Sequence, residues 1–152
     1  MIRFNINGLY HNQCYKPFLE FAFRHAESCS LIVRKTPPLH EKGQNFLKSA
    51  SADLIHASDQ SEWPGTKLIS GVARVHTFGL SPGFRRLFLD ETDDLGGWLS
   101  PTLPEDPAFY RSDGSVLFGS VIHERDAFAD LTDAEAAECR EIVGRENLLQ
   151  TR

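Results

Sequence analysis

The chain has no run near the ~18 apolar residues that a membrane-spanning helix requires. Its opening residues, MIRFNING, lack the basic segment and apolar run of a secretory signal, so we expect neither feature. An excess of basic residues is also missing, because 16 Lys and Arg stand against 21 Asp and Glu, a net charge of −5. This balance disfavours nucleic acid and membranes as partners, since binding to phosphate groups requires clustered basic side chains. The length of 152 residues is that of one domain, 1–152.

Motifs of common cofactor sites are absent as well. The sequence contains no phosphate-binding G-x-x-x-x-G-K-[ST] loop, no G-x-G-x-x-G dinucleotide fingerprint and no H-E-x-x-H zinc motif, each of which supplies a defined set of ligands. We therefore expect no cofactor, and the sequence favours a protein that is not an enzyme.

Cysteine is scarce: the chain has only Cys14, Cys29 and Cys139, with no C-x-x-C pair. An odd number indicates reduced thiols, so we expect a cytoplasmic protein. One metal-ligand pattern exists, His11-x-x-Cys14 followed by His25-x-x-x-Cys29, because imidazole and thiolate at short spacing suit tetrahedral zinc. The alternative places these residues in a loop and in the core. Since the intervening segment has the pattern of an amphipathic helix that needs no metal to pack, we predict no metal site.

The first 35 residues predict a compact strand–helix–strand unit. Ile2, Phe4 and Ile6 alternate with polar residues, as in a half-buried strand. A helix follows with Pro17 in its first turn. The continuous apolar run Cys29–Val33 is typical of a central strand covered on both faces. If the two strands are parallel neighbours, the crossover between them is right-handed.

The middle of the chain predicts further helices and strands. The first elements there are a helix over 39–50, a short strand over 54–57 and a turn at 63–65. The strand-rich segment 66–78 contains Ser70-Gly71, which is either a bulge in one strand or a tight hairpin turn. Ser81 followed by Pro82 predicts the N-cap and first turn of another helix.

The last third predicts a hairpin and a final helix. Asp113-Gly114 between two apolar runs is typical of a type I′ turn, which needs a positive φ at both central residues. Thr132 and Glu135 form a capping-box pattern that begins a helix running to about Glu146. We therefore predict an α+β fold: a mixed sheet of five or six strands, with a β-α-β opening, a C-terminal hairpin and helices mainly on one face.

The charge is distributed unevenly along the chain. Residues 1–76 hold nine basic and six acidic side chains, whereas residues 77–152 hold seven basic and fifteen acidic ones. A strongly acidic surface steers basic partners toward it. The alternative is a solvated surface whose excess acid only keeps the protein soluble. If the acidic surface binds a partner, we expect that partner-binding surface to lie in the second half of the chain.

The longest stretch without hydrophobic periodicity runs from residue 90 to 107, and such loops are often functional. Its acidic side chains flank a group of apolar ones, Leu95, Trp98, Leu99 and Leu103, and the acidic residues are Asp90, Glu91, Asp93, Asp94, Glu105 and Asp106. Apolar contacts within an acidic rim are typical of an interface hot spot. Trp98 is either an exposed contact residue or a lid over the core. The predicted partner-binding residues are Asp90, Glu91, Asp93, Asp94, Trp98 and Leu99.

Two resemblances bear on function. The block from Pro104-Glu105-Asp106 through Phe109-Tyr110-Arg111-Ser112-Asp113-Gly114-Ser115 to His123-Glu124-Arg125-Asp126-Ala127 resembles one found in small stand-alone bacterial proteins. In size, acidity and α+β layout the protein also resembles the broad group of bacterial toxin-immunity proteins. That resemblance implies neutralisation of a toxin by binding, with an acidic surface against a basic active-site cleft.

The leading hypothesis is a non-enzymatic protein that binds a basic protein partner through its acidic half, as an immunity factor or inhibitor. The alternative is a small hydrolase or ligand-binding enzyme that uses His123, Glu124 and Asp126, which follow an apolar strand. A histidine beside a carboxylate can act as a general base, and Arg111 or Arg125 would hold an anion. The sequence leaves the oligomeric state open.

Overall fold

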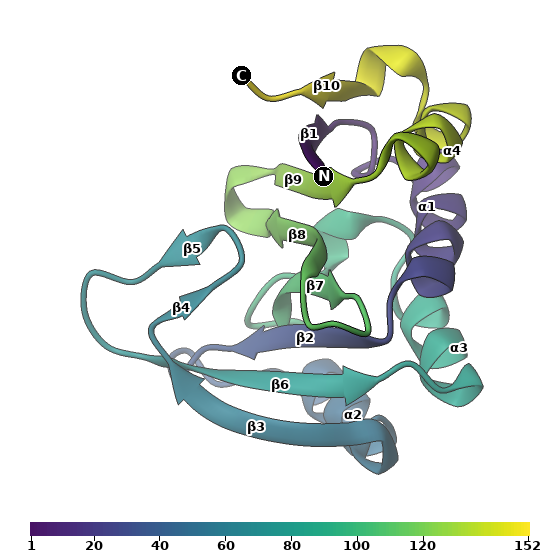
Figure 1. Ribbon diagram of the computed structural model, residues 1–152. Helices are drawn as coiled ribbons and strands as arrows, with labels where there is room; N and C mark the ends of the chain where they lie inside the picture. The colour runs from purple at the N-terminus through teal and green to yellow at the C-terminus, as the bar shows by residue number, and fades with distance from the viewer.

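The computed structural model describes the backbone of residues 1–152 and every side chain except that of Asn12. Over these residues the protein is α+β, with four α-helices, an eight-stranded antiparallel sheet and a separate two-stranded sheet (Figure 1). The helices are α1 (Asn12–His25), α2 (Glu41–Ser49), α3 (Pro82–Glu91) and α4 (Asp133–Val143). The large sheet contains β1 (Ile2–Ile6), β2 (Ser28–Val33), β3 (Leu54–Gln60), β6 (Ala73–Gly79), β7 (Glu105–Tyr110), β8 (Val116–Val121), β9 (Asp126–Leu131) and β10 (Leu148–Gln150). The small one contains β4 (Glu62–Trp63) and β5 (Thr66–Lys67).

The order of strands in the large sheet is β10-β1-β9-β8-β7-β2-β6-β3, and each neighbouring pair is antiparallel. The prediction of a mixed sheet with five or six strands is therefore wrong in both respects. Four antiparallel steps separate β1 from β2, so these strands run parallel without being neighbours. The strands β7, β8 and β9 form an antiparallel meander that lies between them, and local pattern cannot reveal such an insertion.

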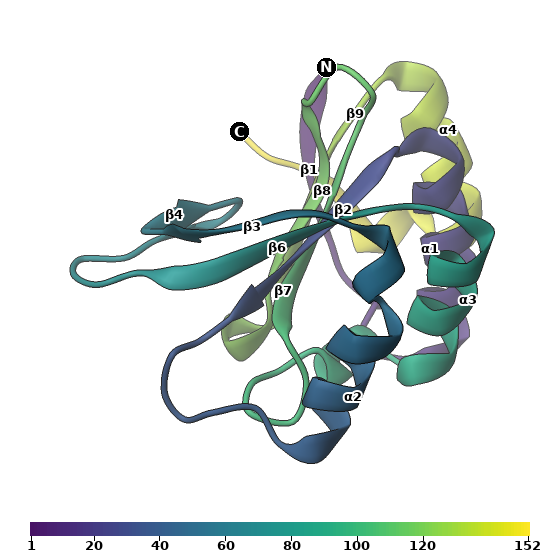
Figure 2. The same ribbon diagram turned by 90° about the horizontal axis from the view of Figure 1, so that it is seen from below.

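The helices all lie on one face of the large sheet, as predicted, and the opposite face is crossed by a short arm formed by residues 61–72 (Figure 2). The core lies between the sheet and the helices and contains twelve of the chain's aromatic side chains among its buried residues. The longest helix in the described chain, α1, has 14 residues, and no described helix is long and apolar enough to cross a membrane.

Helix α1 begins at Asn12, so the prediction that Pro17 lies in the first turn is wrong. Pro17 is inside the helix, where its missing N–H costs one backbone hydrogen bond. The additional N-terminal turn contains Tyr15, which is fully buried in the core. Burial of this large side chain gives a physical reason for the earlier start, because tertiary packing commonly outweighs local propensity.

The hairpin between β7 and β8 is confirmed, but its turn differs from the predicted one. Only Gly114 has a positive φ, of 85°, whereas Asp113 does not. The N–H of Gly114 donates to the carbonyl of Arg111 at 2.9 Å, and the N–H of Arg111 donates to the carbonyl of Ser115 at 2.8 Å. These bonds are those of a longer loop, in which a type I turn is followed by a left-handed glycine.

The last helix has the predicted capping box at Thr132 and Glu135. It ends at Val143, before the predicted Glu146, because Gly144 adopts a positive φ of 90°. A short strand, β10, then pairs with β1 at the sheet edge. A strand of three residues has too little periodicity to be recognised from sequence.

The segment 66–78 is neither of the predicted alternatives. Its first two residues form β5, which pairs with β4 in the arm, and its last six belong to β6 in the large sheet. The predicted turn at 63–65 is confirmed as the connection between β4 and β5. Trp63 packs on Ile32, Ala73 and Val75 as a second, small core under the arm.

Trp98 is a buried core residue, with no exposed surface, so its interpretation as an exposed contact residue is wrong. The indole ring stacks on Phe88 at a centroid distance of 4.2 Å and packs edge-on against Phe46 at 5.1 Å. Its Nε1–H donates to the hydroxyl of Tyr15 at 2.7 Å. The aperiodic loop 92–104 is therefore held to the core by its one tryptophan.

We expect Trp98→Ala to destabilise the protein by about 3–5 kcal/mol, because it leaves a large cavity in a packed core. Tyr15→Phe should cost about 1–3 kcal/mol, since the buried indole N–H loses its acceptor. Leu99→Ala is the matched control, because the adjacent side chain is 38% exposed, and should change stability by only about 0.5–1 kcal/mol. Urea unfolding monitored by circular dichroism measures all three. A Trp98→Ala variant as stable as Leu99→Ala would contradict this packing.

The arm offers a second test, because Gly65 and Gly71 both have a positive φ, of 86° and 77°. A Cβ on Gly65 would lie 2.8 Å from Cγ2 of Val121, whereas a Cβ on Gly71 would meet no atom within 4 Å. Both alanine variants carry backbone strain, but Gly65→Ala should be less stable than Gly71→Ala by a further ~1–3 kcal/mol. Equal unfolding free energies would show that the arm does not pack on Val121.

Candidate functional site

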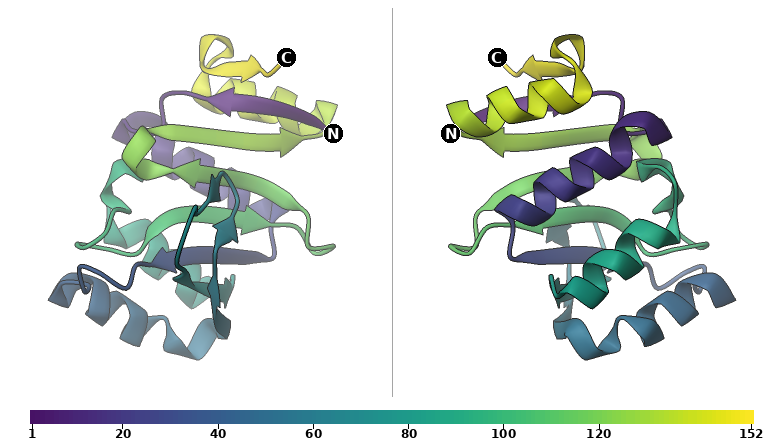
Figure 3. Two further views of the ribbon diagram at one scale, coloured as in Figure 1. Left: turned by 90° about the vertical axis from the view of Figure 1, so that its left-hand side faces the viewer. Right: turned by 90° about the vertical axis from the view of Figure 1, so that its right-hand side faces the viewer.

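One end of the large sheet collects several connections that are far apart in sequence. The views in Figure 3 show four of them at the same end of the strands, opposite the β7–β8 turn. They are the segment between β1 and α1, the segment between β2 and α2, the loop 92–104, and the turn between β8 and β9. Both groups of site residues predicted from the sequence lie in or next to these connections.

Tyr10 brings the acidic loop and the β8–β9 turn together. Its hydroxyl donates to the carbonyl of Asp126 at 3.3 Å, and the Arg125 guanidinium lies 4.4 Å from the centre of its ring. On the other side, the N–H of Leu95 donates to the carbonyl of Leu9 at 3.0 Å. Burial raises the pKa of Tyr10 well above its usual value, the Arg125 charge lowers it in part, and the carboxylates of Asp126, Asp106 and Asp94 raise it further.

Of the predicted partner-binding carboxylates, Asp94 contributes to the raised pKa of Tyr10. Asp90 and Asp93 are exposed, whereas Glu91 and Asp94 are partly buried. The side chain of Asp93, 85% exposed, lies 3.7 Å from Nζ of Lys16, a pair that solvent largely screens. Leu99 is exposed as well. Of the six residues predicted, only Trp98 is removed from the surface.

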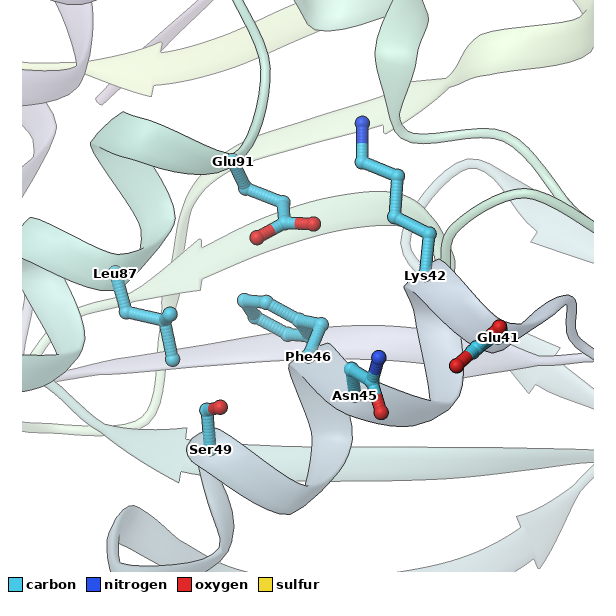
Figure 4. A pocket seen from close by; sticks show the side chains of 7 residues that line it. All are labelled: Glu41, Lys42, Asn45, Phe46, Ser49, Leu87 and Glu91. Atoms are coloured by element: carbon cyan, nitrogen blue, oxygen red, sulfur yellow. The ribbon is translucent and has the colours of Figure 1, made fainter.

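Glu91 lines a pocket of about 380 Å³ between α2 and α3. Figure 4 shows its carboxylate above the ring of Phe46, with Leu87 on one side and Lys42 on the other. Partial burial raises the pKa of Glu91, and the Lys42 charge lowers it in part. Glu91 therefore lies on the helical layer, beside a cation that partly offsets its charge.

The residues of the alternative hypothesis form an open rim. His123 and Glu124 lie in a 3-10 turn after the end of β8, and Nε2 of His123 is 3.7 Å from Oε1 of Glu124. Both side chains are at least half exposed, and Asp126 is exposed as well. His123 lines a depression of the described surface that neither Glu124 nor Asp126 lines. Arg111 is not free to hold an anion, because it donates to Oε2 of Glu135 at 2.6 Å and is mostly buried.

A buried polar cluster lies directly behind His123, and Glu105 and Asp106 belong to it. The sequence predicts that these two carboxylates lie in an exposed acidic rim. This prediction is wrong, because Glu105 is only 4% exposed and Asp106 only 1%. Glu105 accepts two hydrogen bonds from Arg34, from Nε to Oε1 at 3.1 Å and from NH2 to Oε2 at 3.3 Å. Asp106 accepts from Nε1 of Trp63 to Oδ2 at 3.0 Å and from N of Ile122 to Oδ1 at 2.9 Å.

The cluster depends on an irregularity in β7. Successive side chains of a regular strand point to opposite faces, which would separate Glu105 from Asp106. Here the pairing of β7 with β2 shifts register between Ser30 and Ile32, and Asp106 has a left-handed φ of 54°. This conformation is several-fold enriched for Asp among non-glycine residues. Bulges of this kind re-aim side chains, so neighbouring carboxylates converge.

The zinc pattern of the sequence is not assembled. His11 precedes α1 and His25 is its last residue, so a helix of 14 residues, about 21 Å long by its rise per residue, separates them. His25 is bonded to Oε2 of Glu138 at 2.9 Å through its Nε2, and Cys29 is fully buried. Among the described side chains, no three of His11, Cys14, His25 and Cys29 lie close enough to share an ion.

The segment Gly79-Leu80-Ser81-Pro82-Gly83 matches the G-x-S-x-G pattern of a nucleophile elbow, and it joins β6 to α3. Such an elbow needs a strained serine whose hydroxyl is bound by a histidine. Ser81 instead has an ordinary φ of −64°, and its side chain caps α3 by accepting from N of Phe84 at 3.1 Å. No histidine in the described part of the chain hydrogen-bonds to it, so Ser81 serves as the helix cap that Ser81-Pro82 predicts.

We expect NMR titration of Glu91 to give a carboxyl pKa above the ordinary glutamate value. Lys42→Met should raise the pKa of Glu91 further, because it removes the charge that lowers it; Lys35→Met is the matched control and should leave it unchanged. Since folding raises this pKa, the folded chain binds the proton more tightly. Glu91 therefore contributes to the free energy of unfolding at low pH, and this contribution is lost as pH rises through its raised pKa. An unchanged pKa in Lys42→Met would contradict the pocket geometry.

Comparisons with protein-family models, with curated proteins and with solved structures give no match to this chain. A fold of this class serves many functions, so the chemistry and geometry of the site are what indicate this protein's function.

Proposed function

We propose that this protein binds another protein, one with a basic surface, through the end of the sheet around Tyr10. We call this region the acidic end surface, and its residues are Tyr10, Asp90, Glu91, Asp93, Asp94, Leu99, Glu124 and Asp126. The observation that carries the proposal is the position of Tyr10, a partly buried aromatic ring between the acidic loop and the β8–β9 turn. Aromatic contacts surrounded by charge are typical of interface hot spots.

The charge of this surface is only partly compensated. Within the described chain, Lys16 pairs with Asp93, and Asp90, Asp94 and Asp126 have no cationic partner within 4.0 Å. Uncompensated carboxylates attract basic proteins and accelerate their association. Tyr10 and Leu99 would then supply the apolar contact that slows dissociation.

A protein that covers a basic site on its partner acts as an inhibitor, and the resemblance to toxin-immunity proteins supports that form of the proposal. The enzymatic alternative has less support, because Glu124 and Asp126 are exposed on an open rim. The three cysteines are free, and burial raises the pKa of Cys139 to about 12. Buried thiols of this kind are inert and fit the cytoplasmic location that we also propose.

The test compares two variants with the same charge change. Asp93→Lys/Asp94→Lys reverses the acidic end surface, and Glu20→Lys/Glu141→Lys reverses two exposed carboxylates on α1 and α4. Quantitative affinity capture from a lysate of the source organism, with both variants and the unaltered chain as baits, identifies proteins lost only from the first variant. With such a partner purified, stopped-flow mixing should show at least about tenfold slower association for Asp93→Lys/Asp94→Lys at low salt. The difference should shrink at high salt.

Leu99→Ala should leave the association rate of the same partner nearly unchanged and raise its dissociation rate, because it removes apolar contact without changing charge. Circular dichroism confirms that each variant is folded. If every captured protein is retained equally by the two charge variants, or if dissociation is insensitive to Leu99→Ala, this surface is not the binding site.

A further inference from the structure

We propose that Glu105, Asp106 and His123 form a binding site for one divalent transition-metal ion. Each of the three side chains offers a ligand atom, and these atoms all lie within 4.8 Å of one another. Ligands of a single ion whose bonds to oxygen and nitrogen are about 2.0–2.2 Å long lie at most ~4.4 Å apart. A shift of a few tenths of an ångström, which the exposed His123 side chain can supply, therefore lets one ion contact all three. The site borders the acidic end surface at Leu99, but its three ligands are not residues of that surface, and metal binding needs no protein partner.

The topology builds this triad from two strand ends. The bulge at Asp106 turns the two successive carboxylates of β7 toward the same region. The 3-10 turn Ile122–Glu124 ends β8 and places His123 at the rim of that region. The N–H of Ile122, in the same turn, donates to Oδ1 of Asp106, which fixes the turn relative to the carboxylate.

The buried charge of the cluster favours a cation. Glu105 and Asp106 carry two negative charges at under 5% exposure, and Arg34 is the one cationic side chain paired with them in the described structure. Asp106 receives only neutral donors, from Trp63 and Ile122. Because buried carboxylates are normally paired with a cation or coordinate a metal, one negative charge is left for an ion to neutralise.

The hydrogen bonds around the triad suit metal ligation. Each of the four carboxylate oxygens accepts one hydrogen bond, and each has a second lone pair for an ion. Donors behind ligating carboxylates orient them and hold them in place before the metal binds. Trp63 and Arg34 are held in turn by the cation–π contact between them, at 5.0 Å.

A second observation at the same place also points to a ligand. His123 and Glu105 line an open depression of about 410 Å³, together with Leu99 and Ser100. The Oγ of Ser100 is buried and has no hydrogen-bond partner among the described residues. A buried hydroxyl without a partner costs about 1–3 kcal/mol, and rotation of the Ser100 side chain toward the depression would bring it to a metal-bound water. The open side leaves coordination positions for solvent.

The ligand set identifies the class of ion. Two carboxylates and one imidazole, without thiolate, suit first-row ions such as Mn²⁺ and Zn²⁺ better than Mg²⁺, which prefers oxygen ligands and retains its waters. Zn²⁺ should bind more tightly than Mn²⁺, in the general order of affinities for such ligands. Mn²⁺ is the more informative probe, because its paramagnetism reports the number of coordinated waters.

The experiment titrates the purified full chain with Mn²⁺ and follows water-proton relaxation and calorimetric heat. We expect one saturable site per chain, competition by Zn²⁺ at lower concentration, and no competition by equimolar Mg²⁺. His123→Ala should weaken Mn²⁺ binding at least about tenfold. This side chain is 51% exposed, so its removal should leave the fold intact, as circular dichroism will verify.

His11→Ala is the matched control, because it removes another exposed histidine, and it should bind Mn²⁺ like the unaltered chain. Glu105→Gln keeps the shape of the side chain and should weaken binding to a similar extent as His123→Ala. The proposal is overturned if no saturable binding occurs, if His123→Ala binds as tightly as His11→Ala, or if Mg²⁺ competes as well as Zn²⁺.

Discussion

The hydrogen bond from the indole of Trp98 to the hydroxyl of Tyr15 holds the least regular part of this protein in place. The loop 92–104 contains only one short 3-10 turn, so its position is set by the side chains that it buries, Leu95, Trp98 and Leu103, of which Trp98 is the largest. Trp98 enters a pocket between Phe46 and Phe88 and finds its one polar partner at 2.7 Å. An indole N–H buried without an acceptor would be costly. Leu99 and Ser100, next along the chain, are thereby fixed at the end of the sheet.

Periodic segments could be predicted from the sequence, and segments ordered by distant contacts could not. The strand Ile2–Ile6, the caps at Ser81 and Thr132 and the β7–β8 hairpin are as predicted, because their patterns are local. Helix α1 begins before Pro17, since Tyr15 is buried against residues 83 positions away. The prediction of a mixed sheet with five or six strands is wrong for the same reason. β1 and β2 are separated by strands whose pairing no local pattern specifies.

The buried cluster shows a different limit. Acidic residues between prolines, as in Pro104-Glu105-Asp106-Pro107, have the composition of an exposed loop, and carboxylates are almost never fully buried unless paired. Their partners, Arg34 and Trp63, come from the end of β2 and from the arm. Only the left-handed conformation of Asp106 brings both carboxylates to one place. Strand prediction depends on side chains alternating between the two faces of the sheet, and a bulge of one residue reverses that alternation. The prediction that Glu105 and Asp106 are exposed is therefore wrong at this bulge.

The fold brings basic residues of the first half of the chain close to acidic residues of the second half. Basic residues of the first half lie beside acidic residues of the second: Lys16 pairs with Asp93, Arg34 pairs with Glu105, and Lys42 acts on Glu91. The charge difference between the two halves of the chain is therefore partly offset where they meet. Asp94 and Asp126 act on Tyr10, because antiparallel pairing places the ends of β1 and β8 beside the start of β9. The order of the strands, more than the composition, determines where a basic partner would be attracted.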